Sequence, residues 1–244
     1  MKKLFYTILS LGVMVAGASC MKIDNFAEPN ASVSGTIIDK TTGKAMMFDQ
    51  GDTHIRIWER SYSVNPTYQD LAVKADGTYK NTKLFAGTYD MVPCDGAYWP
   101  CDTTYNVKIG KSGKVQDFEV TPYLHVVDFQ QALNGTELTL SCKLQAPVVE
   151  NLPQVVEVRP FLSLNEHCGA ANHINYYYTD TYRVNIRKLW NKIGDADGNG
   201  LETYSITMTV KPGYTYWCRM GVQVNNTYKN WNYSEVVKIT VPKE

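Results

Sequence analysis

Hydrophobic residues alternate with polar ones in short segments along most of the chain after residue 30. This period of two is typical of β-strands that bury one face and expose the other. Three segments of the first half each place these residues on one face: Val33, Gly35 and Ile37; Ile55 and Ile57; Tyr105, Val107 and Ile109. Turn residues such as Asp76-Gly77 separate the segments, which favours antiparallel sheets without long helices.

The second half continues this pattern, and its strands are predicted at residues 155–164, 204–210, 214–224 and 235–241. One segment departs from it, because apolar residues recur with helical spacing between Ile186 and Ile193, ahead of Gly194. That spacing predicts a short connecting helix. The chain as a whole is predicted to be all-β, with two consecutive antiparallel β-sandwich domains at residues 31–122 and 123–244.

The N-terminus has the order of a secretory signal peptide at residues 1–19: two lysines, an apolar run, then small residues. Cys20 follows residues 17–19, Gly-Ala-Ser, in the way that a lipidated cysteine ends a bacterial lipoprotein signal. An ordinary signal cleaved after Ala18 is the alternative. If Cys20 is acylated, residues 20–30 form a tether to the outer membrane, on either its periplasmic or its outer side.

Five cysteines follow the signal, and export makes disulfides feasible. We expect Cys94 to pair with Cys101 across a short loop. Cys142 and Cys218 lie in alternating strands, and a tyrosine precedes the second of them by two residues, which resembles strands B and F of an immunoglobulin sandwich. Their pairing is a second prediction, and two small buried thiols that never bond are the alternative. Cys168 is then left unpaired.

Five segments carry distinctive runs: DNFAEPNASVSGTIIDKTTG (24–43), QGDTHIRIWE (50–59), ADGTYKNTKLFAGTYDMVP (75–93), VQDFEVTPYL (115–124) and NWNYSEVVKI (230–239). Together they resemble a Bacteroidetes family of two-domain lipoproteins of unknown function. The resemblance covers nearly all of the chain beyond the signal, and its first-domain motifs are the more specific.

This resemblance implies a transthyretin-like or carboxypeptidase-regulatory-like first domain and an immunoglobulin-like or fibronectin type III-like second domain. It also implies an association with outer-membrane glycan importers of the starch-utilisation type, beside which members are typically encoded. The family has no established catalytic residues, so none is carried over to this chain.

Charge is balanced, with 24 Lys and Arg against 24 Asp and Glu. Nucleic-acid binding needs a clustered basic face, so no nucleic acid is expected as a partner. The same balance argues against adhesion to anionic lipid by charge. The sequence lacks a Gly-x-Ser-x-Gly elbow, a phosphate-binding glycine loop and a His-Glu-x-x-His motif, so no enzyme is predicted. A glycosidase would require two facing carboxylates.

One loop has the alternating oxygen donors of a calcium site. Asp195, Asp197 and Asn199 provide these donors, and Gly200 stands at the sixth position. Ile206 stands at the twelfth position, where an EF-hand has a glutamate. A polar hairpin turn is the alternative, and no other cofactor is expected.

Aromatic residues supply the functional hypothesis, because sugars stack their apolar faces on Tyr and Trp rings while nearby polar groups bind the hydroxyls. The candidate glycan contacts are Tyr98, Trp99, Tyr228, Trp231 and Tyr233, and residues 176–178 form a further tyrosine cluster. Ordinary packing or use at a domain interface is the alternative for each. We therefore expect a non-enzymatic envelope lipoprotein, an accessory glycan-binding or scaffold component of a polysaccharide-uptake system. The alternative is a structural adhesion or assembly module that binds protein partners, with calcium as a stabiliser.

Overall fold

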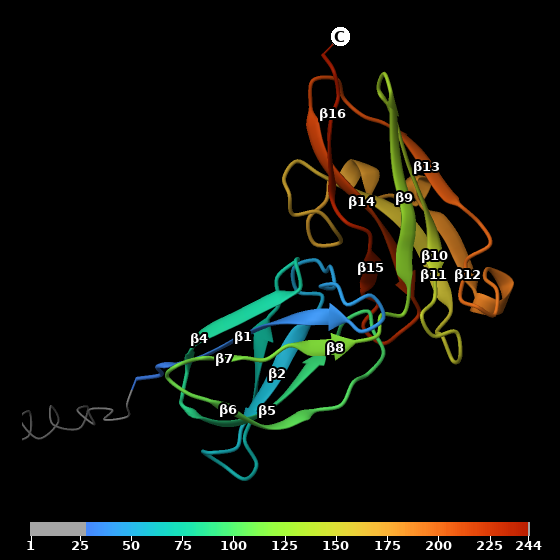
Figure 1. The fold of residues 1–244 in the computed structure, drawn as a ribbon. Helices are drawn as coiled ribbons and strands as arrows, with labels where there is room; N and C mark the ends of the chain where they lie inside the picture. The colour runs from blue at the N-terminus through green and yellow to red at the C-terminus, as the bar shows by residue number, and fades with distance from the viewer. Residues whose placement is uncertain (1–27, 244) are drawn as a thin grey trace, which may run out of the picture.

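A computed structural model describes residues 28–243. The predicted signal peptide, Cys20 and most of the tether lie outside these residues. The described part is all-β, with strands, short 3-10 helices and no α-helix (Figure 1), which confirms the predicted fold class. None of its helices is long and apolar enough to cross a membrane.

The N-terminal domain consists of two facing sheets. Its strands are β1 (Ala31–Asp39), β2 (His54–Glu59), β3 (Tyr68–Ala72), β4 (Thr78–Leu84), β5 (Gly87–Cys94), β6 (Thr104–Ile109), β7 (Lys114–Val115) and β8 (Phe118–Val120). One sheet has the order β3-β2-β5-β6, and the other has β4-β1-β7, with β8 also pairing with β1. Ile37, Ile55, Ile57 and Met91 are fully buried between them.

Two strand pairs of this domain are parallel, unlike the antiparallel arrangement that the sequence pattern predicts. Both β7 and β8 run parallel to β1. Gly35 allows this approach, because a Cβ at that position would overlap the carbonyl oxygen of Gln116.

The face predicted for the strand at residues 104–109 is wrong at one position. Val107 and Ile109 are buried, but Tyr105 is 67% exposed. Asn106 has a φ of 58°, and the pairing of β5 with β6 shifts register there. A β-bulge of this kind reverses the alternation, so Tyr105 points to solvent.

The C-terminal domain also has two sheets. Its strands are β9 (His125–Asn134), β10 (Glu137–Gln145), β11 (Val155–Ser163), β12 (Val184–Lys188), β13 (Tyr204–Thr209), β14 (Thr215–Val224), β15 (Trp231–Tyr233) and β16 (Val237–Thr240). The 3-10 helices are η2 (Asn175–Tyr177), η3 (Asp180–Tyr182) and η4 (Trp190–Lys192). One sheet has the order β13-β10-β9, and the other has β12-β11-β14-β15, with β16 also pairing with β14.

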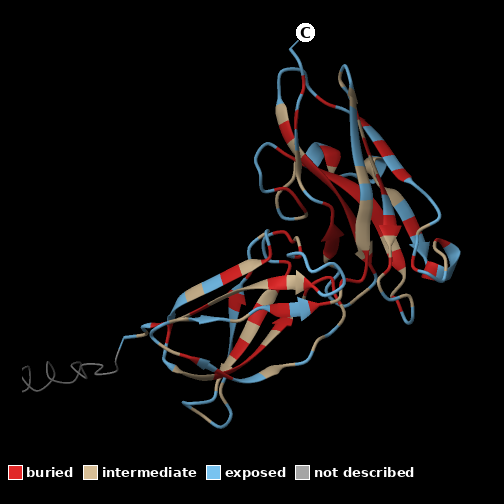
Figure 2. Ribbon diagram, viewed as in Figure 1, coloured by how far each residue is buried: buried red, intermediate tan, exposed pale blue. Residues whose placement is uncertain are grey.

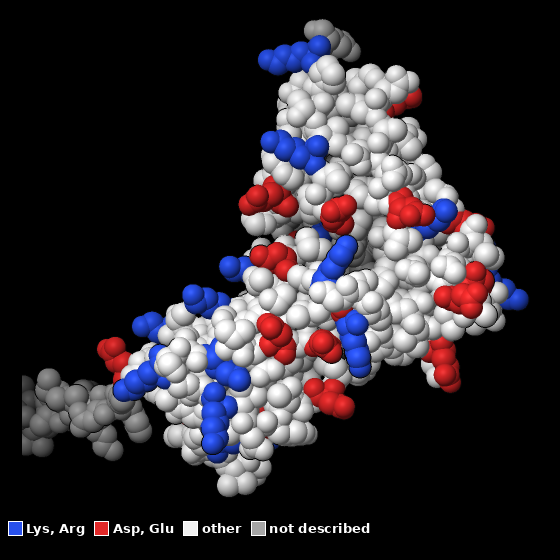
Figure 3. Space-filling view, in the orientation of Figure 1, with Lys and Arg blue, Asp and Glu red and all other residues white. Residues whose placement is uncertain are grey.

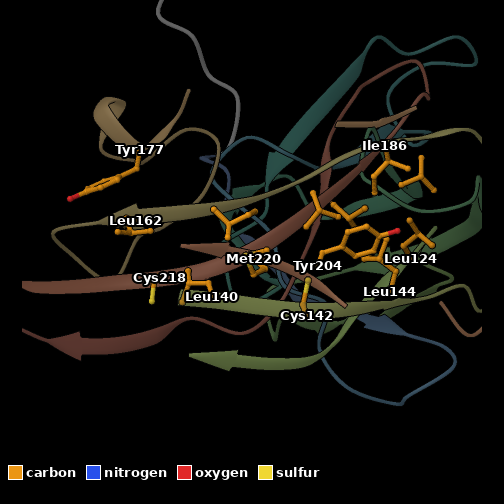
Figure 4. Packing of buried hydrophobic residues seen from close by; sticks show 14 of the residues in the cluster. Leu124, Leu140, Cys142, Leu144, Leu162, Tyr177, Ile186, Tyr204, Cys218 and Met220 are labelled. Carbon is orange, nitrogen blue, oxygen red and sulfur yellow. The ribbon is translucent and has the colours of Figure 1, made fainter. Parts of the chain in front are cut away.

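The core of this domain lies between the inward faces of β10 and β14. The alternation predicted for β10 is observed, since Leu138, Leu140, Cys142 and Leu144 are all at most 1% exposed. They pack in one cluster with Met220 and other residues of β14 (Figure 4). Figure 2 shows the same arrangement as buried positions along the strands of both domains.

The short helix predicted between residues 186 and 193 is wrong. That segment begins in β12, which pairs with β11, and ends in the single 3-10 turn η4. Ile186, Trp190 and Ile193 are buried, while Leu189 is 55% exposed. A strand followed by one tight turn therefore buries three of the four apolar residues, and the pairing with β11 outweighs the helical spacing.

The two domains are joined by buried side chains of the C-terminal domain that bond to backbone carbonyls of the N-terminal domain. The Nδ2 atom of Asn232 donates to Ala97 O at 2.8 Å, and Nη1 of Arg219 donates to Phe48 O at 3.0 Å. Asn230 Nδ2 lies 2.5 Å from the carbonyl oxygens of both Asp52 and Asp95. Breaking such bonds would leave buried polar groups unpaired, so they favour a single arrangement of the domains.

Carboxylates of the N-terminal domain meet this junction from the other side. Asp49 Oδ2 accepts the backbone N–H of Ala171 at 2.6 Å. Asp52 Oδ2 accepts the backbone N–H of Asp49 at 2.9 Å, near Arg219 and Tyr233. Burial is the main reason that the pKa of Asp52 is raised, to about 6; the backbone N–H of Asp49 and the charge of Arg219 oppose the shift, and the Asp49 carboxylate adds to it.

The raised pKa of Asp52 makes stability depend on pH. The folded protein binds this proton more tightly than the unfolded chain, so the contribution of Asp52 to the free energy of unfolding is greatest below about pH 4 and is lost as the pH rises through about 6. We expect Asp52→Asn, which keeps an oxygen acceptor but cannot ionise, to be more stable than the natural chain at pH 7. The gain is up to about 3 kcal/mol at roughly 1.4 kcal/mol per pKa unit. Urea unfolding at pH 4 and pH 7 measures it.

Asp76→Asn is the matched control for this prediction. Hydrogen bonds from Thr78 hold the pKa of Asp76 below its usual range, so its replacement should lower stability at pH 7. The assignment of the junction effect to Asp52 is wrong if D52N has the same pH dependence as the natural chain.

Candidate functional site

A groove of about 630 Å³ in the C-terminal domain is lined by four tyrosines. We call it the tyrosine groove. Its wall consists of Thr136, Leu164, Ile174, Tyr176, Tyr177, Thr209, Val210, Lys211, Pro212, Tyr214 and Tyr216. These residues come from the β9–β10 turn, the connection between β11 and η2, η2 itself, the end of β13, the β13–β14 connection and the start of β14. The groove therefore lies at the end of the domain that is remote from the N-terminal domain (Figure 1).

Two tyrosines form the fixed floor of the groove. Tyr177 and Tyr216 are buried, with ring centroids 6.3 Å apart and planes at 88°. The hydroxyl of Tyr177 donates to Thr209 O at 3.0 Å, and the hydroxyl of Tyr216 accepts the backbone N–H of Lys211 at 3.2 Å. Burial raises the pKa of Tyr177 well above its usual range.

Two other tyrosines form the exposed rim. Tyr176 is 67% exposed and Tyr214 is 47% exposed. Tyr176 packs edge-on against Tyr177, with ring centroids 5.1 Å apart. Tyr214 stacks on Tyr216, with ring centroids 6.1 Å apart and an interplanar angle of 28°. Their ring faces are thus held in place while remaining accessible to a ligand.

A short 3-10 turn positions Tyr176 and Tyr177. The backbone N–H of Ile174 donates to Leu162 O at 2.7 Å, which ties the segment to β11, and Tyr177 N then donates to Ile174 O at 2.9 Å. On the other side, Pro212-Gly213 makes the turn that leads into Tyr214, and Gly213 has the positive φ of 77° that such a turn requires.

The chemistry of the groove is that of binding. Its polar groups are the hydroxyls of two threonines and of the tyrosines, together with the ammonium group of Lys211. No carboxylate, histidine or cysteine is part of the described wall, so the groove offers no acid–base pair or nucleophile of the usual kinds. Flat aromatic faces beside a few hydrogen-bonding groups suit a ligand with both apolar faces and hydroxyls.

Three of the five aromatic residues predicted to contact glycan are buried and serve in packing. Tyr98 is 4% exposed, and its hydroxyl bonds with Thr53 at 2.7 Å. Trp231 packs edge-on against Phe161, with centroids 5.1 Å apart. The guanidinium of Arg219 lies 3.5 Å from the ring centroid of Tyr233, at the domain junction. The alternative use in packing and at an interface therefore applies to these three.

The other two predicted aromatics keep exposed surface at different places. Trp99 is half-buried against Tyr123 and lines a separate polar hollow with Asp102. Tyr228 is 54% exposed and lies beside Asp95. Neither lines the tyrosine groove.

The predicted disulfides are not formed in the structure, where all five cysteines of the described residues have free thiols. The alternation of β5 buries Pro93 and turns Cys94 the other way, whereas Cys101 packs against the core and its Sγ lies 3.6 Å from Pro93 O. Cys142 and Cys218 lie on opposing sheets (Figure 4), and burial raises the pKa of both thiols to about 12. Cys168 is also buried.

The loop predicted to bind calcium is built as a hairpin turn. Asp195 Oδ1 accepts the backbone N–H of Asn199 at 2.8 Å, and Asp195 N donates to Asn199 O at 2.9 Å. Gly198 has a φ of 84°. Asp197 is exposed and contributes no bond to the turn. Within residues 28–243 no group of three or more His, Cys, Asp and Glu side chains is placed to hold a metal ion.

The sequence identified the tyrosine cluster at residues 176–178 but not Tyr214, which was included in the strand predicted at residues 214–224. The strand β14 begins one residue later, at Thr215, so Tyr214 belongs to the turn. The available signal was Pro212-Gly213, which marks a turn immediately before it.

Two domain families match the chain. The family described as "Protein of unknown function (DUF3823) N-terminal domain" matches residues 31–121. The family described as "Domain of unknown function (DUF3823_C)" matches residues 124–238. A search of curated proteins found no match.

Several crystal structures have the same two-domain fold. A candidate carbohydrate-binding protein from Bacteroides uniformis ATCC 8492 is 23% identical, with a TM-score of 0.71, over 87% of this chain and 99% of the other. A DUF3823 family protein from the same strain is 20% identical, with a TM-score of 0.73, over 88% and 100%. A DUF3823 family protein from Parabacteroides merdae ATCC 43184 is 19% identical, with a TM-score of 0.64, over 88% and 100%. At these identities the likeness establishes the fold alone.

Proposed function

Because the chain belongs to the DUF3823 family and carries its N-terminal and C-terminal domains in order, we propose that it is a non-enzymatic glycan-binding protein of the bacterial cell envelope. In this proposal the tyrosine groove is the binding site and the rest of the fold presents it. The protein acts as an accessory component of an outer-membrane polysaccharide-uptake system, as the sequence resemblance implies.

The observation that carries the proposal is the pair of exposed rim tyrosines on a rigid tyrosine floor. Tyr176 and Tyr214 offer ring faces to solvent, and the groove has the volume for a short stretch of sugar residues. Thr136, Lys211 and the tyrosine hydroxyls supply hydrogen-bonding groups for sugar hydroxyls. The carbohydrate-binding description of the Bacteroides uniformis relative is consistent with such a ligand.

The proposal includes export and lipidation at Cys20, followed by a tether to the start of the first domain. Anchoring at the N-terminus would leave the tyrosine groove, at the opposite end of the molecule, facing away from the membrane. A polysaccharide outside the bilayer would then reach it without obstruction.

Replacement of the rim tyrosines tests the binding site. We expect Tyr176→Ala and Tyr214→Ala each to lower the affinity for a bound polysaccharide by about tenfold or more, because each removes an exposed stacking face. Affinity electrophoresis in gels that contain a panel of soluble polysaccharides, followed by calorimetry on the best ligand, measures the change.

Tyr105→Ala is the matched control, because Tyr105 is 67% exposed like Tyr176 but lies on β6 of the other domain. It should leave the affinity unchanged. If no polysaccharide of a broad panel binds, the glycan proposal fails, and co-purification of envelope proteins would instead favour the assembly module.

Replacement of Cys20 tests the anchor. In cells, Cys20→Ser should abolish acylation and release the protein from the membrane fraction, because two or three acyl chains at about 0.8 kcal/mol per buried methylene supply the attachment. Intact mass spectrometry of the natural protein should find the acyl groups. A mature chain that begins at Ser19 and lacks fatty acid would establish the ordinary signal peptide instead.

A further inference from the structure

One end of the N-terminal domain collects the turns that lie farthest from the domain junction. Glu59 pairs with Tyr89, and Gly87 pairs with Ile109, so the end of β2, the start of β5 and the end of β6 lie at the same end of the sheet. In the facing sheet Ala31 pairs with Leu84, so β1 begins and β4 ends there. We call this the outer end. It consists of residues 60–67, 83–88 and 108–114 with the start of β1.

Basic side chains are concentrated at the outer end although the whole chain is neutral. Arg60, Lys83, Lys108, Lys111 and Lys114 are all exposed there. The acidic groups nearby are Glu28, Glu59 and Asp90, and Asp90 is buried and paired with Arg60, so the four lysines supply the excess positive charge. The other acidic groups of this domain lie elsewhere, several toward the junction: Asp39, Asp49, Asp52, Asp70, Asp76, Asp95, Asp102, Asp117 and Glu119. Figure 3 shows several blue side chains gathered on the lower left with one red group at that edge, and side chains of both colours nearer the middle.

Large apolar side chains project from the same end. Tyr62 is 83% exposed and Val64 is 87% exposed in the β2–β3 loop, and Phe85 is 46% exposed in the β4–β5 turn. Val64 and Tyr62 are the two most exposed large hydrophobic side chains of the described residues.

The β2–β3 loop is held in an ordered form that keeps these side chains outward. Arg60 Nε lies 2.5 Å from Asp90 Oδ2, and its Nη1 donates to Val64 O at 3.1 Å. At the other side of the loop base, Thr88 N donates to Ser61 Oγ at 2.6 Å. The loop therefore does not fold back onto the domain to cover Tyr62 and Val64.

The chain enters the domain at this end. Ala31 follows Cys20 by 11 positions, and a peptide of that length spans at most about 40 Å when fully extended. An acyl group on Cys20 would thus keep the outer end, rather than the tyrosine groove, close to the lipid.

We propose that the outer end of the N-terminal domain docks on a membrane surface that carries anionic headgroups. The lysines neutralise the headgroup charge, and Tyr62, Val64 and Phe85 enter the interfacial region, where aromatic and apolar side chains are favoured. The inference rests on the proposed anchoring at Cys20. Docking of the outer end would give the protein a second contact with the lipid surface, whereas the tether alone would leave its orientation undefined.

Vesicle co-sedimentation of the acyl-free chain tests the docking separately from the anchor. Every described strand lies between residues 31 and 240, so a chain that begins at residue 21 retains the whole fold. We expect it to bind vesicles of phosphatidylcholine with 30% phosphatidylglycerol at about 20 mM salt, and to be largely released at about 500 mM salt, because screening shortens the Debye length to a few ångströms.

Matched charge reversals locate the surface. Lys108→Glu with Lys111→Glu should lower the fraction bound to the anionic vesicles at least about tenfold. Lys188→Glu with Lys192→Glu, which reverses two exposed lysines of the C-terminal domain, should leave it unchanged. Tyr62→Ser with Val64→Ser should remove the binding that persists at high salt, because apolar burial is not screened.

Equal binding to pure phosphatidylcholine vesicles, equal loss in the two lysine pairs, or no vesicle binding at all would each overturn the docking. The proposed anchor would be unaffected by those results, since the acylation of Cys20 is measured independently by mass. Conversely, an unacylated Cys20 with intact vesicle binding would remove the anchor and leave the docking surface.

Discussion

The structure depends most on the hydrogen bonds by which buried side chains of one domain reach backbone carbonyls of the other. Asn232 and Arg219 are at most 4% exposed and bond to Ala97 and Phe48 across the junction. A side-chain bond to a carbonyl specifies position and angle, whereas apolar contact alone would allow sliding. The junction thereby fixes the outer end of the first domain and the tyrosine groove at opposite ends of the molecule.

The strand pattern of the sequence was sufficient for the fold class because each sheet buries one face. The alternation at Leu138, Leu140, Cys142 and Leu144 reads directly as β10, and no other element could bury all four on one side. The pattern failed where pairing departed from regular geometry. The bulge at Asn106 and the edge strand β12 both depend on a partner strand, and a single segment carries no information about its partner.

The site was harder to predict than the fold, because aromatic residues serve packing and recognition with the same chemistry. Trp231 and Tyr233 have the composition of a sugar site, with Asn232 between them. Both rings nevertheless pack edge to face against Phe161, and Tyr233 also lies beneath the guanidinium of Arg219 at the domain junction. Which tyrosines remain exposed is decided by tertiary contacts. Tyr214 immediately precedes β14, which begins at Thr215. Because it lies in the turn and not in the strand, its side chain belongs to the rim of the groove and not to the core.

The net charge of the sequence is misleading in a similar way, because it does not show that the fold places basic and acidic side chains at different ends of the N-terminal domain. The neutral total of the sequence argued against contact with anionic lipid, but folding gathers lysines from β4, β6, the β6–β7 turn and β7 at the outer end and places several carboxylates toward the junction. Asp49 and Asp52 are needed there, where one accepts a backbone N–H of the second domain and both face Arg219. The joining of the domains thus itself draws negative charge toward the junction. Because the domain as a whole is nearly neutral, carboxylates held at the junction leave an excess of basic groups at its other end. The contacts of the junction, which orient the groove, therefore also separate the charges along the molecule.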